Sequence, residues 1–174
     1  MPSADGVVRA LVANVAREDA GVLRFDYALE ATVSRIRVPS RRPSSQADEL
    51  WKHTCFEAFI APAVGGDEYR EINFSPSTEW ATYAFTSYRK GMTSVALAAA
   101  PRIEVSESGS QLTVQARIGT AGLLPESWRA PGAKLRIALA AVIEGDGGKL
   151  SYWALRHAPD KADFHHSAGF ILEV

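Results

Sequence analysis

Strict alternation of apolar and polar residues is the feature that most limits what this chain can fold into. In GVLRFDYAL (residues 21–29), Leu23, Phe25 and Tyr27 are separated by polar or small residues. Successive side chains of an extended strand point to opposite faces, so this pattern indicates a strand with one buried face. Similar segments recur and predict about nine or ten short strands. They are residues 21–29, 34–39, 54–62, 68–74, 80–85, 102–107, 111–118, 134–144, 149–155 and 170–174.

Turn residues join several of these segments into hairpins. Residues 102–118 contain two alternating segments joined through Ser108-Gly109-Ser110, and residues 134–155 contain two joined by GDGG. VVRALVANVARED (residues 7–19) fits a helix as well as a strand, but the turn that follows leads straight into another strand and favours a hairpin. One short helical turn is expected to begin at Pro125.

The predicted elements amount to a single all-β domain. The chain has 174 residues, a usual length for one domain. Many short strands separated by turn residues favour a sandwich or jelly roll over any α/β fold. We therefore expect one antiparallel β-sandwich over residues 1–174, of the immunoglobulin-like or jelly-roll kind.

Charge and cysteine content exclude several classes of function. Lys and Arg number 19 against 20 Asp and Glu, so the net charge of -1 gives no broad attraction to nucleic acid or to a membrane surface. Cys55 is the one cysteine, which precludes an intrachain disulfide. The first residues, MPSADG, lack a basic start followed by an apolar segment. We expect a cytoplasmic protein; the pattern predicts no oligomeric state.

The common catalytic and nucleotide-binding motifs are missing. The sequence contains no GxGxxG after a strand, no GxxxxGK[ST], no HExxH and no GxSxG. A metal-dependent enzyme that uses His157, Asp163 and His165 remains an alternative, because imidazole and carboxylate ligands suit zinc or iron. On an extended strand His165 and the next residue, His166, point to opposite faces, which argues against a shared ion.

Polar residues on two expected strands form the second group of candidates. Tyr69, Glu71 and Asn73 share one face of residues 68–74, and Glu57 faces away from the apolar side of residues 54–62. A buried Glu or Asn without partners costs free energy, so this face meets either solvent or a polar site. Glu57 and Glu71 also suggest a hydrolase with paired carboxylates. The structural alternative is that both glutamates bond nearby arginines.

Aromatic residues near the expected strand ends suggest stacking against a ring. Such side chains beside carboxylates and amides are suited to a sugar or a planar ligand. Packing at the rim of the sandwich is the alternative for any one of them. The group comprises Trp51, Trp80, Trp128, Trp153, Tyr69, Tyr83 and Tyr152.

Four segments together resemble a known family. They are LWKHTCFEAFIAP, EYREINFSPSTEWATYAF, YRKGM and SYWALRHAPDKADFHH, in order from Leu50 to His166. These segments resemble the bacterial DOMON-like proteins, which are related to the family-nine carbohydrate-binding modules. The resemblance implies a β-sandwich that binds a ligand, with haem or a sugar proposed for the superfamily. It covers about two-thirds of the chain.

The resemblance and the residue patterns together predict a non-catalytic module that binds a small molecule. The expected ligand is a carbohydrate or a cell-wall-precursor sugar, with no cofactor. The haem alternative would use Met92, the one internal methionine, with His53, His157 or His165. The candidate ligand-binding residues are Trp51, His53, Glu71, Asn73, Trp80, Arg89, Trp153, His157, Asp163 and His165.

Overall fold

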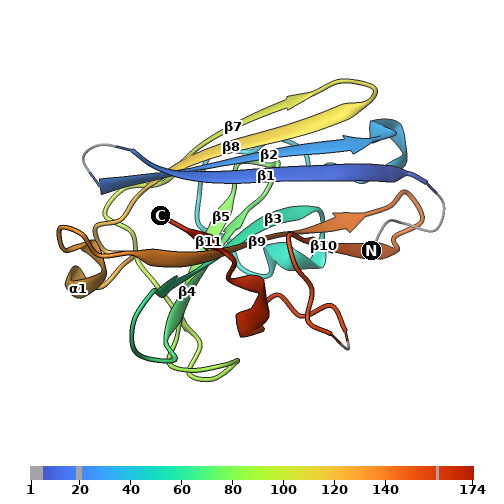
Figure 1. Ribbon diagram of the computed structural model, residues 1–174. Coiled ribbons are helices and arrows are strands. Elements are labelled where there is room, and N and C mark those ends of the chain that lie inside the picture. Colours follow the sequence, from blue (N-terminus) through green and yellow to red (C-terminus); the bar gives the residue numbers. More distant parts are fainter. Residues whose placement is uncertain (1–5, 19–20, 160) are drawn as a thin grey trace.

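Two antiparallel sheets packed face to face form the protein. The computed structural model describes residues 6–18, 21–159 and 161–174. Within these residues, β1, β2, β8 and β7 form a four-stranded sheet in that order, and β10, β9, β3, β4, β5 and β6 form a larger sheet in which β11 also pairs with β9. Figure 1 shows the four-stranded sheet above the seven-stranded one. The prediction of a single all-β sandwich is confirmed.

The strands follow the alternating segments closely. The four-stranded sheet contains β1 (Val8–Glu18), β2 (Val22–Ala31), β7 (Arg102–Glu107) and β8 (Gln111–Gly119). The seven-stranded sheet contains β3 (Cys55–Pro62), β4 (Tyr69–Phe74), β5 (Trp80–Phe85), β6 (Thr93–Ser94), β9 (Leu135–Glu144), β10 (Leu150–Ala154) and β11 (Leu172–Glu173). One helical turn, α1 (Glu126–Arg129), follows Pro125 as predicted, and single 3-10 turns are η2 (Val33–Arg35), η3 (Leu50–Lys52) and η4 (Ser167–Gly169).

The main core lies between the two sheets. Leu23, Phe25 and Tyr27 of β2 are buried there, as the alternation predicts. From the other side, Phe56 of β3 and Phe74 of β4 meet them, with Phe74 5.5 Å from the Phe25 ring and Phe56 5.1 Å from the Tyr27 ring. The inner faces of β2, β3 and β4 therefore agree with the alternation in the sequence.

The outer face of the seven-stranded sheet is also covered. Phe59, Tyr69 and Phe85 form a second apolar cluster there. Residues 155–159 and 161–171, called the C-terminal segment below, pack on this cluster through Phe164 and Phe170. Figure 1 shows this segment, with η4, beneath the seven-stranded sheet. The sheet is thus buried on both faces, which explains why β3 and β4 are buried at nearly every residue.

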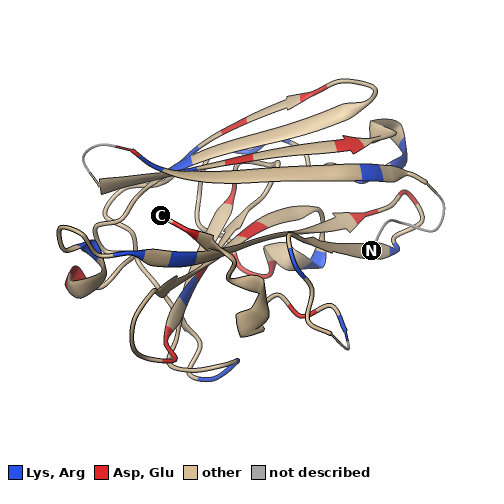
Figure 2. Ribbon diagram, in the orientation of Figure 1, with Lys and Arg blue, Asp and Glu red and all other residues tan. Residues whose placement is uncertain are grey.

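The outer face of the four-stranded sheet remains open and charged. Arg24 of β2 bonds Glu18 and Asp26 at 3.1 and 2.9 Å, and Arg117 of β8 bonds the same Glu18 at 3.3 Å. All of these side chains are partly exposed to solvent. Figure 2 shows acidic and basic residues close together on these strands. No described helix is long and apolar enough to cross a membrane.

The structure differs from the predicted strands at two places and agrees with the predicted first hairpin. The prediction of a strand over residues 34–39 is wrong. The 3-10 turn η2 is followed there by a single isolated β-bridge, between Ile36 and Gly145. This segment leaves the end of β2 and reaches the end of β9, so it crosses between the sheets and cannot extend a ladder in either. The short strand β6 was not predicted. The hairpin of β1 and β2 is confirmed, although residues 19 and 20 of its turn lie outside the described residues.

Candidate functional site

A cavity of about 560 Å³ opens on the outer face of the seven-stranded sheet. Its floor belongs to β3, β4 and β9, because Glu57, Glu71 and Val142 line it. Its walls come from η3, from the loop after β5, from β10 and from the C-terminal segment. The wall residues are Trp51, Lys52, Phe85, Arg89, Met92, Leu150, Tyr152, Ala162, Phe164 and His165.

Three buried polar side chains of β3 and β4 lie at or below the floor. Glu57 is directly opposite Asn73 in the ladder, and Phe59 is opposite Glu71, so the two glutamates lie diagonally on one face. Asn73 donates from Nδ2 to Glu71 Oε1 at 2.9 Å. Glu57 Oε1 and Asn73 Oδ1 are buried and have no hydrogen-bond partner among the described residues. The floor therefore presents acceptors whose bonding capacity is unused.

Burial dominates the electrostatics of this floor. It raises the pKa of Glu71 to about 7, against a smaller opposing effect of the bond from Asn73. Burial also raises the pKa of Glu57 well above its usual value, and the nearby Glu71 carboxylate raises it further. Two carboxyls at close quarters in a low-dielectric site disfavour each other's ionisation. Near neutral pH the pair therefore retains protons that exposed glutamates would lose.

His165 connects this floor to Tyr69. The Tyr69 hydroxyl accepts from the Arg89 backbone N–H at 3.2 Å and lies 2.8 Å from His165 Nδ1. Its own proton is thus directed to Nδ1, which accepts it, and the single ring proton of the neutral imidazole is assigned to Nε2. That nitrogen lies 3.9 Å from Glu71 Oε2. Burial lowers the pKa of His165 to about 4, so the imidazole is neutral near pH 7.

Asp163, in the C-terminal segment, holds two wall residues of the cavity in place through hydrogen bonds. Its carboxylate, 4% exposed, accepts from Arg89 Nη2 at 2.8 Å, from the His165 backbone N–H at 3.1 Å and from the Tyr88 hydroxyl. These bonds and the Arg89 charge lower the pKa of Asp163 against the opposing effect of burial. Asp163 therefore acts as an anchor for Arg89 and His165.

The loop after β5 that carries Arg89 needs an unusual backbone. Arg89 itself has φ of 54°, and Gly91 has φ of 66°. A Cβ at Gly91 would collide with the Thr86 side chain. A left-handed glycine is therefore required for the loop to turn so tightly beside the cavity.

Aromatic side chains stand on opposite sides of the floor. Trp51 of η3 packs edge-on against Tyr83 of β5, with ring centroids 5.7 Å apart. Tyr152 of β10 packs edge-on against Phe164 at 6.0 Å. β9 and β3 lie between β10 and β4 in the sheet. β10 and β4 are therefore three inter-strand spacings apart, roughly 14 Å at about 4.8 Å for each spacing. This is wide enough for a ring-shaped ligand between the walls.

Six of the predicted site residues gather around this cavity. Trp51, Glu71, Arg89 and His165 line it. Asn73 supports the floor through Glu71, and Asp163 supports the wall through Arg89. Whether these six residues bind a ligand stays a prediction.

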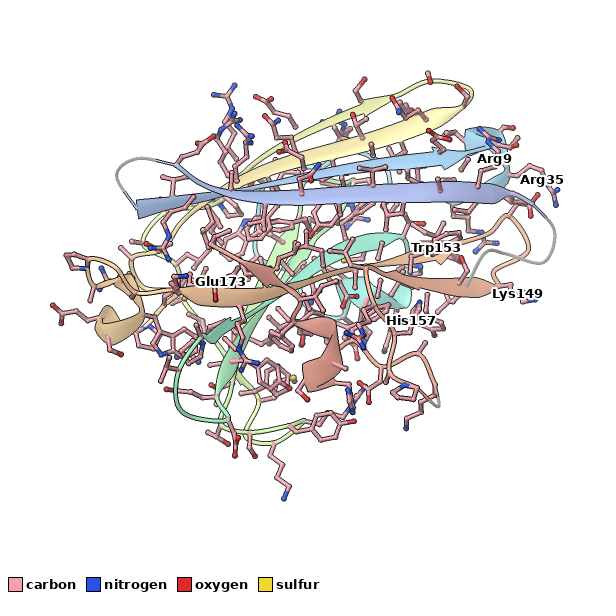
Figure 3. The ribbon with its side chains drawn as sticks, viewed as in Figure 1. Arg9, Arg35, Lys149, Trp153, His157 and Glu173 are labelled. Atoms are coloured by element: carbon pink, nitrogen blue, oxygen red, sulfur yellow. The ribbon has the colours of Figure 1, made fainter. Side chains whose placement is uncertain are left out.

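The other four predicted residues lie elsewhere. Trp80 pairs with Phe74 on the inner face of the sheet, and Trp153 pairs with Ala141 and packs against the main core. His53 bonds Glu144 at 2.7 Å beside a separate surface hollow. His157 lies against Phe164, at 6.4 Å between the rings, and is not among the lining residues of the cavity. Figure 3 shows Trp153 and His157 on opposite sides of β10.

Sequence reasoning left most lining residues out of its site set, and three of the lining or supporting residues are instructive. Glu57 and Tyr69 were recognised as polar strand residues, and Tyr152 as an aromatic one, but none was chosen as ligand-binding. The alternation of side chains along a strand could have corrected the choice of Trp153 in place of Tyr152 on β10. Tyr152 and Trp153 are neighbours, so one alone can share the face of Val142, and the ladder gives that place to Tyr152.

The structure also bears on the metal and haem alternatives. Among the described residues, no group of three or more His, Cys, Asp or Glu side chains is arranged to hold a metal ion. Met92 and His165 line the same cavity, but His165 directs Nδ1 to Tyr69 and Nε2 toward Glu71. An axial imidazole needs one nitrogen directed at iron. This arrangement does not fit a haem-ligating pair, and haem stays a prediction.

Comparison with known proteins supports the fold. No protein-family model matches the sequence, and no curated protein matches it significantly. The structure is similar to the crystal structure of a protein from Bacteroides uniformis that is proposed to bind carbohydrate, with a TM-score of 0.64 and 13% sequence identity. The match covers 92% of this chain and 75% of the other. At this identity the likeness concerns the fold; the resemblance to DOMON-like proteins stays a prediction.

Proposed function

We propose that this protein is a non-catalytic module that binds a carbohydrate in the cavity on the outer face of the seven-stranded sheet. The observation that carries the proposal is the combination of aromatic walls with a floor of buried polar acceptors. Trp51 and Tyr152 line the walls of the cavity, and Glu57 and Glu71 line its floor.

This combination suits the chemistry of a pyranose. A sugar ring has apolar C–H faces, which stack on aromatic side chains, and a rim of hydroxyls, which need hydrogen-bond partners. Glu57 Oε1 has no partner among the described residues, so a ligand hydroxyl donating to it would satisfy a buried acceptor. Such a bond is worth more in a dehydrated cavity than at the surface. The similarity of fold to a protein proposed to bind carbohydrate agrees with this class of ligand.

Binding can be tested by calorimetric titration against a panel of soluble glycans. We expect at least one sugar to bind below the millimolar range. Trp51→Ala should weaken that binding by roughly tenfold or more, and Trp51→Phe, which keeps an aromatic face, by less. If no sugar on the panel binds, or if Trp51→Ala binds as tightly as the wild type, the proposal is wrong.

A hydrolase with paired carboxylates is the second candidate, because Glu57 and Glu71 both line the cavity with raised pKa values. Retaining and inverting glycosidases place two carboxyls about 5–10 Å apart. Prolonged incubation with a bound oligosaccharide, followed by chromatography, separates the two functions. A binding module returns the oligosaccharide intact; shortened products that disappear in Glu71→Gln would establish the hydrolase instead.

A further inference from the structure

The unusual feature of the cavity is that its floor offers acceptors and no free cation. Glu57 and Glu71 line the floor and are 3% and 5% exposed. Most buried carboxylates in proteins are paired with Arg or Lys. No salt bridge joins Glu57 to a described cation, and the one contact of this kind at Glu71 is with His165 at 3.9 Å.

The cations around the cavity are already committed to other carboxylates. Arg89 bonds Asp163 at 2.8 Å, and Lys52 bonds Glu49 at 2.6 Å. His165 receives a hydrogen bond from Tyr69 and is neutral near pH 7. The wall pairs are therefore each close to neutral, and among the described residues neither floor carboxyl has an Arg or Lys partner at salt-bridge distance.

The walls favour a positive group above that floor. Trp51, Phe85 and Tyr152 line the cavity, and the negative face of an aromatic ring attracts a cation. The buried Glu57 Oε1, which has no described partner, supplies an acceptor on the floor of the same cavity. Carboxylates beneath aromatic rings form a suitable environment for an ammonium group.

We propose that the ligand of this cavity is a saccharide that carries a free primary ammonium group, held by Glu57 and Glu71. This inference rests on the proposed carbohydrate-binding function and names the class of sugar. The ammonium donates to the ionised carboxylate of one glutamate and to the carbonyl oxygen of the other, which keeps its proton, while the apolar face of the sugar ring stacks on the wall. N-acetylation would remove the charge and place an apolar methyl group against the polar floor.

Binding of such a sugar is coupled to release of a proton. The empty pair retains protons near pH 6, because burial and mutual repulsion oppose ionisation. An ammonium group stabilises one ionised carboxylate in the pair, so one carboxyl proton leaves for the buffer as the sugar enters. Other titratable groups also face the two glutamates. On the strands they are Cys55 of β3, Tyr69 of β4, Tyr83 of β5 and Tyr152 of β10. Around the walls they are Lys52, His165 and the ion pair of Arg89 with Asp163.

Three matched disaccharides test the inference. Cellobiose, diacetylchitobiose and the free-amine chitosan disaccharide share one β-1,4-linked backbone and differ at C2 as hydroxyl, acetamide and ammonium. Calorimetry at pH 6 in two buffers of different ionisation enthalpy reports both affinity and protons released. We expect the ammonium sugar to bind at least tenfold more tightly than the other two, with close to one proton released, and its affinity to rise about tenfold or more from pH 5 to pH 7.

Charge-neutral variants identify the residues responsible. In Glu57→Gln and Glu71→Gln, the ratio of affinities between the ammonium and hydroxyl sugars should fall toward one. Glu104→Gln, on the exposed strand β7 of the other sheet, is the matched control and should keep the wild-type ratio.

The possible outcomes separate this inference from the proposed function. If cellobiose or diacetylchitobiose binds as tightly as the ammonium sugar, and no proton is released, the ammonium inference is wrong while carbohydrate binding stands. If a sugar elsewhere on the glycan panel binds in the cavity and the ammonium sugar does not, the inference is also wrong. If no sugar binds, both proposals fail together.

Discussion

The outer faces of the two sheets carry charged residues at the same alternating positions, yet these residues end in opposite environments. On the four-stranded sheet, Arg24 and Asp26 are paired and partly exposed. On the seven-stranded sheet, Glu57 and Glu71 are buried, and among the described residues neither has an Arg or Lys partner; His165 lies 3.9 Å from Glu71. The C-terminal segment causes the difference, because it covers one outer face while the other stays in water.

The comparison teaches that alternation alone does not distinguish a solvated polar face from a polar site. A charge on an open face keeps its hydration, and its ion pair contributes little. A carboxyl under a covering segment loses hydration, so its pKa rises and its bonding capacity is left for a ligand. Three variants should therefore change stability by decreasing amounts. The first removes an apolar contact with the C-terminal segment, the second removes a buried carboxyl, and the third removes an exposed one.

Removing the apolar contact beneath the covering segment should have the largest effect. Phe59 is fully buried and lies 6.5 Å, between ring centroids, from both Phe164 and Phe170. Phe59→Ala should lower the free energy of unfolding by about 3–5 kcal/mol, measured by urea denaturation. Val12→Ala, at a residue 54% exposed on the open sheet, is the control and should change it by less than about 0.5 kcal/mol. Similar losses in the two variants would refute the covered-face interpretation.

Removing the buried charge should make stability less sensitive to pH. Burial raises the pKa of Glu71 from 4.5 to about 7. The stability that comes from keeping this proton is fully present below about pH 4.5 and is lost as pH rises through 7. Glu71→Gln lacks this loss, so between pH 5 and pH 8 it should gain about 2 kcal/mol relative to the wild type in chemical denaturation. A constant difference across this range would show that Glu71 titrates as an exposed glutamate does.

Removing an exposed charge should have the smallest effect. Glu18 bonds Arg24 and Arg117 on the open sheet, where all three side chains are partly exposed. Glu18→Gln should shift Tm by less than about 3 °C, and the shift should shrink further in 1 M salt, because water and ions screen such pairs. A larger, salt-independent shift would mean that this charge network is shielded from solvent.

Much of the fold could be predicted because strand periodicity is local. The alternation in residues 54–62 and 68–74 placed Phe56 and Phe74 on one face and Glu57 and Glu71 on the other, as the structure has them. Residues 34–39 misled the prediction because they alternate over a few positions while the chain crosses between sheets. The two-residue strand β6 offers too short a pattern to detect.

The candidate site was predicted less well, because its members come together only through long-range contacts. Trp80 and Trp153 are aromatic residues at strand ends, as Tyr152 is, but their ladders turn them to the inner face. His157 and His165 belong to one short segment, yet His165 alone reaches the cavity. Residue type identified plausible ligand contacts; the direction of each side chain needed the register.

The sequence by itself determined an all-β sandwich, the position of most strands and which side chains of a strand share a face, because these follow from a period of two residues. Only the tertiary structure decided that the outer face of the seven-stranded sheet is covered and that Glu57, Glu71 and His165 meet there. Residues 57 and 165 are far apart in the chain, and no local pattern states that one will bury the other. Burial, which turns two ordinary strand glutamates into buried carboxyls with raised pKa values, is a property of that packing.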